Sequence, residues 1–558
     1  MKRGKNLKTL LVGINSKYIH SNLAIRYIKK YVEKNSEYKI KIREWTINNH
    51  IEKIIKDIYN EKPEILAFSV YIWNSEYVFK IIKEIKKILP EIKLILGGPE
   101  VSYNSIELMK KIKEIDYIIK GEGERTFLNL LSKNMNGLKG LYYREENEVK
   151  YNGDNSFIIN LDEVPFVYDD EEIENLKNRI IYYESSRGCP FNCSYCMSSI
   201  EKRVRFFSNE RTKKDLKFFL DKKVKLIKFV DRTYNIDKKR YLDIWKFLLE
   251  NYSKESKFHF EISVDLFDDE ILDFLKKVPE DYFQFEIGIQ TSNEKTLKAI
   301  NRSTNMEKLE KNIKRLIENG NIHIHLDLIA GLPYEDYESI GKSFNYIYNF
   351  KSEMFQLGFL KILEGTQIST EIEEFEYKYL SSPPYEVLEN KFMSYKELQK
   401  IKDIEHLLDI YYNSGDFKKS VDYIIINCYD NSFAFYEEIS EYWVKKGYFE
   451  VKHKKNQYFN YLYEFIGSKN INLEKFEEIL KFDYLCLGKP GVFPEWYKRN
   501  QDKERYDEVL KNEVFKNQRE AHKKSEFEKF SYDVINEKIK NVEILFLYDK
   551  GLKIKVIK

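Results

Sequence analysis

SSRGCPFNCSYCMSS (185–199) holds three of the five cysteines in this chain of 558 residues, Cys189, Cys193 and Cys196, in the spacing C-x-x-x-C-x-x-C. Three thiolates on one short loop can bind three irons of a 4Fe-4S cluster and leave the fourth iron open to another ligand. A structural zinc ion favours four protein ligands, yet no other Cys or His lies within about sixty residues of the loop. A disulfide would leave one thiol over. We therefore predict an iron–sulfur cluster on this loop, with Cys428 and Cys486 outside any metal site.

The loop follows the first of six strand-like runs that alternate with helical stretches, at 180–185, 226–231, 258–263, 283–290, 322–331 and 355–363. This alternation predicts an α/β fold with a partial (β/α)6 barrel. Because neighbouring side chains of a strand point to opposite faces, one face of each central run is apolar. The other face carries His259, Glu261, Ser263, Asp265, Gln284, Glu286, Gly288, Gln290, His323, His325 and Asp327. A closed barrel is usually filled with branched apolar side chains, so this polar lining indicates a wet cavity that holds a ligand, although a structural hydrogen bond is the alternative for any single residue.

Before the loop, β-rich runs at 8–14, 39–45, 65–71, 93–98 and 117–123 alternate with amphipathic stretches. This pattern is typical of a parallel sheet covered by helices, and such sheets bind ligands outside the carboxyl ends of their strands. Small and polar residues gather at those ends: Asn15, Ser69, Tyr71, Gly97, Gly98, Pro99, Glu100, Gly121, Glu122, Gly123 and Glu124. A tight turn explains any one glycine. Four such loops at one edge favour a ligand site.

The sequence divides into four segments. Residues 1–155 form a Rossmann-like α/β domain that ends in a hairpin-like piece (138–153), and 156–177 form a linker. Residues 178–378 form the barrel. Residues 379–558 are mainly helical and end in a predicted hairpin at 542–557, with Asp549-Lys550-Gly551 as its turn.

Bulk composition argues against a disordered chain and against a membrane-spanning one. Hydrophobic residues are 42% and charged residues 33%, which predicts a globular chain. The 94 Lys and Arg residues against 91 Asp and Glu residues leave a net charge of +3. This small charge does not indicate a nucleic acid or membrane partner. No run approaches the roughly 18 apolar residues of a spanning helix, and the polar start leads into a strand without an export signal. We expect a cytoplasmic protein.

The cysteine loop, with Tyr195 just before its third cysteine, resembles the signature of the radical S-adenosylmethionine (radical SAM) enzymes. GIQTSNEKTLKAINR (288–302), DLIAGLPYE (327–335) and LKILEGT (360–366) are similar to later strand ends of that superfamily, so the resemblance covers 178–375. It implies that the open iron binds the amino and carboxylate groups of SAM. It also implies that one electron from the cluster splits SAM into methionine and a 5′-deoxyadenosyl radical.

The resemblance also assigns roles to single residues. Cys189, Cys193 and Cys196 would ligate iron, and Tyr195 would lie near the adenine. Asp231 stands where the family often has a Gly-Gly-Glu run that contacts the methionine amine, although this sequence reads VDRTYN there. The remaining implied SAM contacts are Glu261 and Glu286 for the methionine and ribose groups, and Gly331, Leu332 and Ile362 for the adenine edge.

In the first domain, FSVYIWN (68–74), LGGPEVS (96–102) and GEGERTF (121–127) resemble the cobalamin-binding domain that precedes the barrel in one large subgroup. The resemblance implies that the strand-end residues named above line a cobalamin site. The D-x-H-x-x-G motif that ligates cobalt in many cobalamin proteins is absent, and NSKYIHS (15–21) stands in its place. We therefore expect His20 to be a surface residue and cobalt to have no side chain on its lower face.

PPYEVL and YYNSG in the last third resemble an uncharacterised carboxyl-terminal domain attached to such enzymes. The whole predicts a cobalamin-dependent radical SAM enzyme that methylates an unactivated centre of an unknown small-molecule or peptide substrate, with flavodoxin or ferredoxin as reductant. A radical rearrangement or cyclisation and a non-catalytic iron–sulfur or corrinoid redox protein are the alternatives. The tRNA methylthiotransferase group needs three further cysteines in its first domain, and none precedes Cys189 here.

Overall fold

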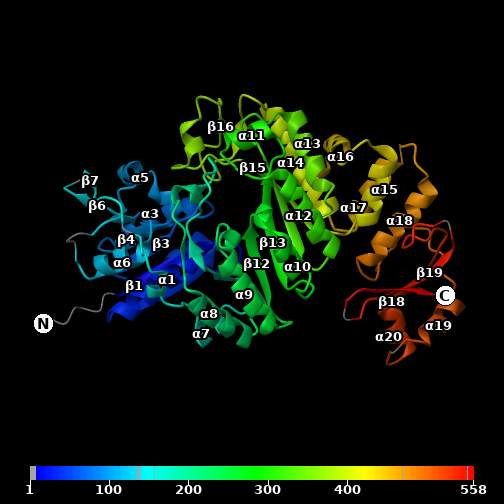
Figure 1. Cartoon of the computed structure of the whole chain (residues 1–558), viewed down its shortest axis with the longest axis horizontal. Coiled ribbons are helices and arrows are strands. Elements are labelled where there is room, and N and C mark those ends of the chain that lie inside the picture. The colour runs from blue at the N-terminus through cyan, green and yellow to red at the C-terminus, as the bar shows by residue number, and fades with distance from the viewer. Residues whose placement is uncertain are drawn as a thin grey trace. The chain divides into compact units, whose positions relative to one another are not determined.

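The computed structural model describes residues 8–134, 138–146, 148–155, 157–467, 469–513, 515–538, 540–549 and 551–557 (Figure 1). Its contacts divide the chain into two compact units. The first comprises Met1–Asp336 and Phe359–Ser394, and the second comprises Tyr337–Gly358 and Tyr395–Lys558.

The first unit opens with the predicted parallel sheet, which has the strand order β2-β1-β3-β4-β5-β6-β7. Strands β1 to β5 pair in parallel, and β6 and β7 extend the sheet as an antiparallel hairpin beyond β5. The hairpin-like piece at 138–153 therefore belongs to this sheet; its Asn147 lies outside the described residues. The strands are β1 (Thr9–Asn15), β2 (Ile40–Thr46), β3 (Ile65–Ser69), β4 (Lys93–Gly97), β5 (Tyr117–Ile119), β6 (Leu141–Glu145) and β7 (Glu148–Tyr151).

Helices cover both faces of this sheet, so its central strands are apolar on both sides. One core joins α2, α3 and α5 to alternate residues of β1, including Leu10, Val12 and Ile14. The other joins α1 and α6 to the opposite face, including Leu11. The helices are α1 (Leu23–Asn35), α2 (Ile51–Glu61), α3 (Ser75–Ile88), α4 (Pro99–Ser102), α5 (Ser105–Lys111) and α6 (Gly123–Leu131).

A connector with η1 (Leu161–Glu163) and α7 (Asp170–Asn175) leads into the second parallel sheet. Within the first unit this sheet contains β8 (Ile181–Tyr183), β11 (Leu226–Phe229), β12 (Lys257–Ile262), β13 (Phe283–Gln290) and β14 (His323–Ala330), paired in parallel in that order. The predicted alternation is confirmed, because Phe283, Phe285, Ile287 and Ile289 are buried while the residues between them are half-buried. The sixth predicted run forms β15 (Met354–Phe359).

The helices between these strands are α8 (Asn209–Asp221), α9 (Lys238–Glu250), α10 (Asp269–Leu275), α11 (Glu294–Ala299) and α12 (Met306–Asn319). Short pieces complete the first unit: β9 (Ser186–Arg187), η2 (Met197–Ile200), β10 (Arg205–Phe206), η3 (Tyr234–Ile236), η4 (Val264–Leu266), η5 (Gln367–Thr370), β16 (Lys378–Tyr379) and β17 (Val387–Glu389).

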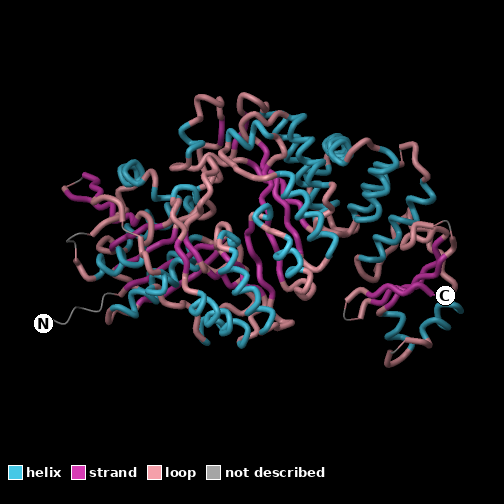
Figure 2. Tube along the Cα trace, viewed as in Figure 1, coloured by secondary structure: helices cyan, strands magenta, loops and turns pink. Residues whose placement is uncertain are grey.

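The second unit is mainly helical, as Figure 2 shows, and ends in a small antiparallel sheet. The predicted hairpin at 542–557 is confirmed as β19 (Val542–Leu547) and β20 (Lys553–Ile557); Lys550 of its predicted turn lies outside the described residues. A further strand, β18 (Ser525–Phe530), pairs with β19. The helices are α13 (Tyr337–Tyr348), α14 (Tyr395–Leu408), η6 (Asp409–Asn413), α15 (Lys418–Cys428), α16 (Ser432–Lys446), η7 (Tyr448–Glu450), α17 (Gln457–Ile466), α18 (Leu473–Cys486), α19 (Lys503–Leu510) and α20 (Gln518–Lys523).

In the part of the chain that the structure describes, every helix lacks the length and apolar character needed to cross a membrane.

Candidate functional site

The cysteine loop begins directly after β9 and turns at Gly188. Gly188 has φ +91°, and a Cβ there would lie 2.3 Å from the Arg203 carbonyl oxygen, so only glycine fits. Cys189 and Cys193 are buried, Cys196 is half-buried, and all three thiols are free. The loop therefore presents reduced sulfur ligands from a backbone that is fixed at its start.

Hydrogen bonds from distant segments hold the middle of this loop. The Ser194 amide donates to the Ile300 carbonyl at 2.9 Å, and its carbonyl accepts from the Ile368 amide at 2.9 Å. Arg302 Nη1 lies 3.7 Å from Cys193 Sγ, and Thr233 Oγ1 lies 3.8 Å from Cys189 Sγ. Burial raises the pKa of the Cys193 thiol, and the Arg302 guanidinium opposes this rise.

Within the described residues, no group of three or more His, Cys, Asp or Glu side chains converges on the position of a single metal ion. A cube of four irons spreads its thiolate ligands around a larger body than one ion does. The three thiols on one anchored loop, with a guanidinium beside them, fit an anionic cluster of that kind.

Asp231 follows β11 and is buried against the start of the cysteine segment. Its carboxylate accepts hydrogen bonds from the Ser185 amide at 2.9 Å, the Ser185 hydroxyl at 2.6 Å and the Ser186 hydroxyl at 2.5 Å. These bonds satisfy both carboxylate oxygens within the protein. Asp231 thus fixes the chain that leads into the cysteine loop.

The polar face of the second sheet carries an internal charge network. Glu286 Oε2 accepts from Lys228 Nζ at 3.1 Å and lies 2.9 Å from His259 Nε2. These partners, His259 foremost, lower the pKa of Glu286 to about 2. Burial raises the pKa of Glu261 to about 7, aided by the neighbouring Glu286 charge, and burial lowers the pKa of His325 to about 4.

On the same face, and at Arg302 in the loop after α11, buried polar atoms lack hydrogen-bond partners. They are Gln290 Oε1, Asp327 Oδ1 and Arg302 Nε. Burial, with the charges of Glu286 and Glu261, raises the pKa of Asp327 well above its ordinary value. Such atoms are costly unless a ligand satisfies them. Sequence reasoning placed Gln290 and Asp327 on the polar face but did not select them, or Arg302, as ligand contacts.

The backbone at this point is also unusual. Gln290 has φ +72°, a conformation that non-glycine residues rarely adopt. Its side chain folds back over Gly288, where an added Cβ would lie 2.1 Å from Gln290 Nε2. The Arg302 guanidinium donates to the Gly288 carbonyl. The unusual backbone of Gln290 thus places its amide over Gly288, where the Arg302 guanidinium also lies.

The predicted adenine-edge residues lie in well-packed surroundings. Leu332 and Ile362 are buried, and the Gly331 carbonyl accepts from Asn390 Nδ2 at 2.9 Å and Tyr377 Oη at 3.3 Å. Tyr195 is half-buried, and burial raises the pKa of its phenol despite nearby Arg302. Leu332 and Ile362 can therefore offer only their backbone or an apolar wall to a ligand.

At the strand ends of the first sheet, Asn15, Ser69 and Glu100 have partners inside the protein. Asn15 Nδ2 donates to the His20 carbonyl at 3.0 Å and to Glu44 Oε1 at 3.1 Å. Ser69 Oγ accepts from Asn22 Nδ2 at 3.2 Å. Glu100 accepts from Tyr385 Oη at 2.5 Å, and burial raises the Glu100 pKa.

The remaining features of this edge are backbone and ring surfaces. Tyr71 stacks on Trp73 with ring centroids 4.4 Å apart. An added Cβ at Gly98 (φ +114°) would meet the Val70 carbonyl at 2.4 Å, so Gly98, followed by Pro99, makes a turn that requires glycine. At Gly97 an added Cβ would meet only the Ile119 carbonyl, at 3.7 Å.

The loop after β5 differs from its neighbours because its acidic residues reach the second domain. Glu122 pairs with Arg187 at 3.0 Å and Arg205 at 2.7 Å, and Glu124 pairs with Arg187 at 2.7 Å. Between them Gly123 begins α6. An added Cβ at Gly121 would meet no atom within 4 Å, so this glycine borders open space.

His20 lies in the loop that replaces the D-x-H-x-x-G motif. It is half-buried, and its Nδ1 lies 2.7 Å from Tyr182 Oη at the start of the second sheet. Burial lowers the pKa of His20, and the positive charge of Lys17 lowers it further. His20 is therefore bonded across the two domains of the first unit.

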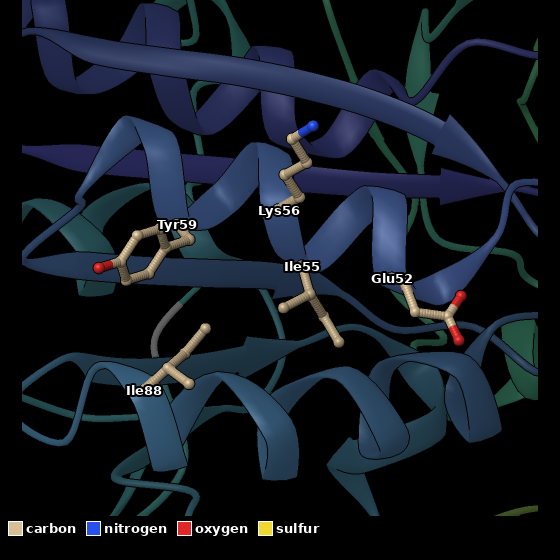
Figure 3. Close-up of a pocket in the computed structure, with 5 residues that line it drawn as sticks. All are labelled: Glu52, Ile55, Lys56, Tyr59 and Ile88. Atoms are coloured by element: carbon tan, nitrogen blue, oxygen red, sulfur yellow. The ribbon is translucent and has the colours of Figure 1, made fainter.

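A surface groove lies apart from these sites, between α2 and α3 of the first domain (Figure 3). Glu52, Ile55, Lys56, Tyr59 and Ile88 line it. None of these residues belongs to the strand-end loops or the cysteine loop.

Three family models match the chain. They are a B12 binding domain over residues 9–131, the radical SAM superfamily over 183–347, and a protein family of unknown function, DUF4080, over 373–548. These matches confirm the predicted cobalamin-binding domain, radical SAM domain and distinct carboxyl-terminal domain, in that order.

Similar proteins include an uncharacterized methyltransferase, PH0819, of Pyrococcus horikoshii, which is 26% identical over 360 residues, 62% of this chain and 77% of that protein. The cobalamin-dependent radical SAM methyltransferase TokK of Streptomyces tokunonensis is 26% identical over 308 residues, 49% of this chain and 43% of TokK. The match thus spans less than half of TokK. The solved structure of the cobalamin-dependent SAM radical enzyme OxsB, with aqua-cobalamin and SAM bound, has a TM-score of 0.59 at 16% identity and covers 92% of this chain and 82% of OxsB. This likeness concerns the fold.

Proposed function

We propose that this cobalamin-binding radical SAM enzyme methylates an unactivated centre of a small-molecule or peptide substrate. Two observations carry the proposal: three free thiols with Arg302 Nη1 3.7 Å from Cys193 Sγ, and the buried atoms of Gln290, Asp327 and Arg302 that lack hydrogen-bond partners. When bound, the reduced cluster supplies the electron that cleaves SAM, and cobalamin carries the methyl group.

Cys189, Cys193 and Cys196 are the proposed iron ligands. Their loop is fixed at Gly188 and at Ser194, and Asp231 fixes the chain before it through Ser185 and Ser186. A metal ligand set held in this way needs little rearrangement when iron binds. The Arg302 guanidinium beside Cys193 favours the thiolate form that iron requires.

Glu261, Gln290, Arg302 and Asp327 are the proposed polar contacts of SAM, with Glu286 behind them in the network of His259 and Lys228. A guanidinium suits a carboxylate, and acidic side chains suit an amine or sugar hydroxyls. The orphaned atoms supply both kinds of partner. Tyr195, Gly331, Leu332 and Ile362 remain the proposed surroundings of the adenine.

The strand ends of the first sheet are the proposed cobalamin site. Two glycines here leave room for a flat macrocycle. An added Cβ would meet no atom within 4 Å at Gly121, and at Gly97 it would meet only the Ile119 carbonyl at 3.7 Å. Tyr71 offers a ring surface. Asn15, Ser69, Gly98, Pro99, Glu100, Glu122, Gly123 and Glu124 frame that space.

A low-potential reductant such as flavodoxin or ferredoxin is the proposed partner. We place the protein in the cytoplasm, where thiols stay reduced and such carriers operate. The substrate itself must enter beside both cofactor sites.

The test is anaerobic reconstitution with iron, sulfide and hydroxocobalamin, followed by addition of SAM and a chemical reductant. We expect both 5′-deoxyadenosine and S-adenosylhomocysteine, because reductive cleavage and methyl donation are separate fates of SAM. 5′-Deoxyadenosine alone, with no retained corrinoid, would support the rearrangement alternative. Neither product, with an intact cluster, would indicate a non-catalytic redox protein.

A further inference from the structure

Arg187 connects the cysteine loop to the first domain through three carboxylates. Its Nε donates to Glu184 at 2.9 Å, Nη1 pairs with Glu122 at 3.0 Å, and Nη2 pairs with Glu124 at 2.7 Å. The guanidinium also lies 5.4 Å from the ring centroid of Tyr27 on α1. The Arg187 side chain is 10% exposed and that of Glu124 is 5% exposed, so water competes little for these bonds.

A second arginine supports the same loop from the neighbouring strand. Arg205 of β10 is paired with Arg187 of β9 in the sheet register. Arg205 shares Glu122 Oε1, at 2.7 Å, donates to the Ile158 carbonyl at 2.6 Å and contacts Glu201. Glu122 Oε2 accepts from the Ile158 amide at 2.8 Å. Oε1 of Glu122 thus binds both arginines of the second domain, and Oε2 binds the linker between the domains.

The path from Arg187 to the iron ligands is short and stiff. Gly188 follows with φ +91° and leaves no room for a side chain against the Arg203 carbonyl, and the Cys189 amide then donates to the Glu201 carbonyl at 3.1 Å. A shift of the Arg187 backbone therefore moves Cys189.

The path to the first domain's strand ends is equally short. Gly121, which borders open space, precedes Glu122, and Glu124 lies in the first turn of α6. The loop that frames the proposed cobalamin site is therefore held by the same guanidinium that begins the cysteine loop.

We propose that Arg187 is a positioning residue: with Glu122 and Glu124 it fixes the Gly121–Glu124 loop against the cysteine loop, and so sets the separation between cobalamin and the iron–sulfur cluster. This inference rests on the proposed function for the identity of the two cofactors. Transfer between cofactors and substrate depends steeply on geometry, since a misplacement of about 1 Å can cost about a hundredfold in rate.

Arginine suits this role better than lysine. A planar guanidinium directs its donors to three carboxylates at once, whereas an ammonium is a single compact charge. Arg187→Lys therefore keeps the charge and loses the geometry. Glu124→Gln keeps the shape and removes one ionic partner.

A matched control is present in the same domain. Arg211 of α8 pairs with buried Asp215 at 2.8 Å, and their further bonds reach the Val164 carbonyl and Tyr183 Oη rather than the cysteine loop or the loop after β5. Arg211→Lys should lower the midpoint of thermal unfolding without altering the relation between the two loops.

The experiment measures the relation of the loops with and without cofactors. In protein that lacks both cofactors, amide hydrogen exchange of residues 117–126 should be about tenfold faster in Arg187→Lys and in Glu124→Gln than in the parent protein, because local opening then costs less free energy. In protein loaded with hydroxocobalamin and cluster, and then reduced, pulsed electron paramagnetic resonance should show a broader distribution of cobalt-to-cluster distances. Arg211→Lys should leave both measurements unchanged.

Parent-like exchange and an unchanged distance distribution in Glu124→Gln and Arg187→Lys would overturn the positioning role. If Arg187→Lys fails to fold, the isosteric Glu124→Gln decides the question alone. Failure of the parent protein to retain corrinoid would instead count against the proposed function, and the hydrogen exchange of the cofactor-free variants would still decide whether Arg187 fixes the two loops.

Discussion

The residues proposed to contact the ligand differ between the two cofactor edges of the first unit, because some of those at the second sheet hold buried polar atoms without partners. At the second sheet, Gln290 Oε1 and Asp327 Oδ1 are buried without a partner. At the first sheet, Asn15 and Ser69 bond within the protein, and Glu122 and Glu124 bond Arg187. The difference matches the chemistry of the two ligands, because SAM presents charged groups and hydroxyls, whereas a corrin presents mainly a broad flat surface.

The comparison also separates two ways of building a site. Buried polar atoms without partners lower the stability of the free protein and are repaid when the ligand arrives. Glycines that border open space cost little in the free protein and admit a large ligand. Substitutions of the unpartnered groups at the second sheet should therefore weaken ligand binding without lowering stability. Substitutions of the partnered groups at the first sheet should lower stability.

The largest effect is expected at the thiols. Cys193→Ala should lose the cluster and all SAM cleavage, because two thiolates on one loop cannot hold a cube that needs three protein ligands. Iron analysis should fall from about four irons per chain to almost none. Cys428→Ala is the control, since Cys428 lies on α15 in the second unit; loss of iron there, with iron retained in Cys193→Ala, would refute the ligand assignment.

The next effect separates the two edges directly. Asp327→Asn should weaken SAM binding by about ten- to a hundredfold, as expected for a hydrogen bond to a charged group worth about 1.5–3 kcal/mol, and should leave thermal stability unchanged or higher. Asn15→Ala should do the reverse: it should lower stability by about 1–3 kcal/mol, because the His20 carbonyl loses its bond from Asn15 and Glu44 loses one of its donors, and should leave SAM affinity unchanged.

Equilibrium dialysis with SAM and urea denaturation measure the two quantities. If Asp327→Asn unfolds the protein and binds SAM normally, the unpartnered oxygen serves the fold and the contrast between the edges disappears.

The sequence alone predicts which residues share a strand face, but it does not predict their hydrogen-bond partners. Period-two alternation put Glu261, Gln290 and Asp327 on one face because neighbouring side chains of a strand point to opposite faces. It could not reveal which of them would lack a partner, since Glu286 finds Lys228 only through strand pairing 58 residues away.

Long-range charge pairing hid other features. Glu124 was predicted to face cobalamin, and its bond to Arg187 spans 63 residues. β18 was missed because Glu526 and Glu528 interrupt its apolar pattern; both are buried because Arg499 and Lys481, distant in sequence, pair with them. A local pattern carries no information about such partners.

A smaller effect is expected on the titration of Glu261 at the second sheet. Glu261 has a pKa of about 7 in the folded protein against 4.5 ordinarily, so between these values the folded state holds a proton that the unfolded state has released. Stability should therefore fall as pH rises from about 4.5 to 7. The positive sulfonium of SAM should favour the ionised form of Glu261. SAM binding near pH 6.5 should therefore release up to about one proton from Glu261.

Calorimetry in two buffers of different ionisation enthalpy measures that proton release. Glu261→Gln should abolish it, while Glu286→Gln should only reduce it, because Glu286, with a pKa of about 2, carries no proton there but its charge helps to raise the Glu261 pKa. Equal proton release in the Glu261 variant would assign the titration to another group.

The smallest expected effect is at His20, where we expect no change in the cobalt spectrum. His20 stands in the loop that replaces the D-x-H-x-x-G motif, yet its Nδ1 is bonded to Tyr182 Oη at 2.7 Å and its loop is tied to the second sheet by the Ser21 hydroxyl, which donates to the Ile180 carbonyl at 2.9 Å. Moving His20 beneath cobalt would break the bond to Tyr182. Electron paramagnetic resonance of the bound cobalt(II) form should therefore show no nitrogen superhyperfine splitting, in the parent protein and in His20→Ala alike. The variant should lose only a modest amount of stability, about 1 kcal/mol, for the lost hydrogen bond. Nitrogen splitting that disappears in His20→Ala, and persists in Tyr182→Phe, would show instead that the histidine leaves its partner to ligate cobalt, and the first edge would then resemble the second in holding a polar group ready for its ligand.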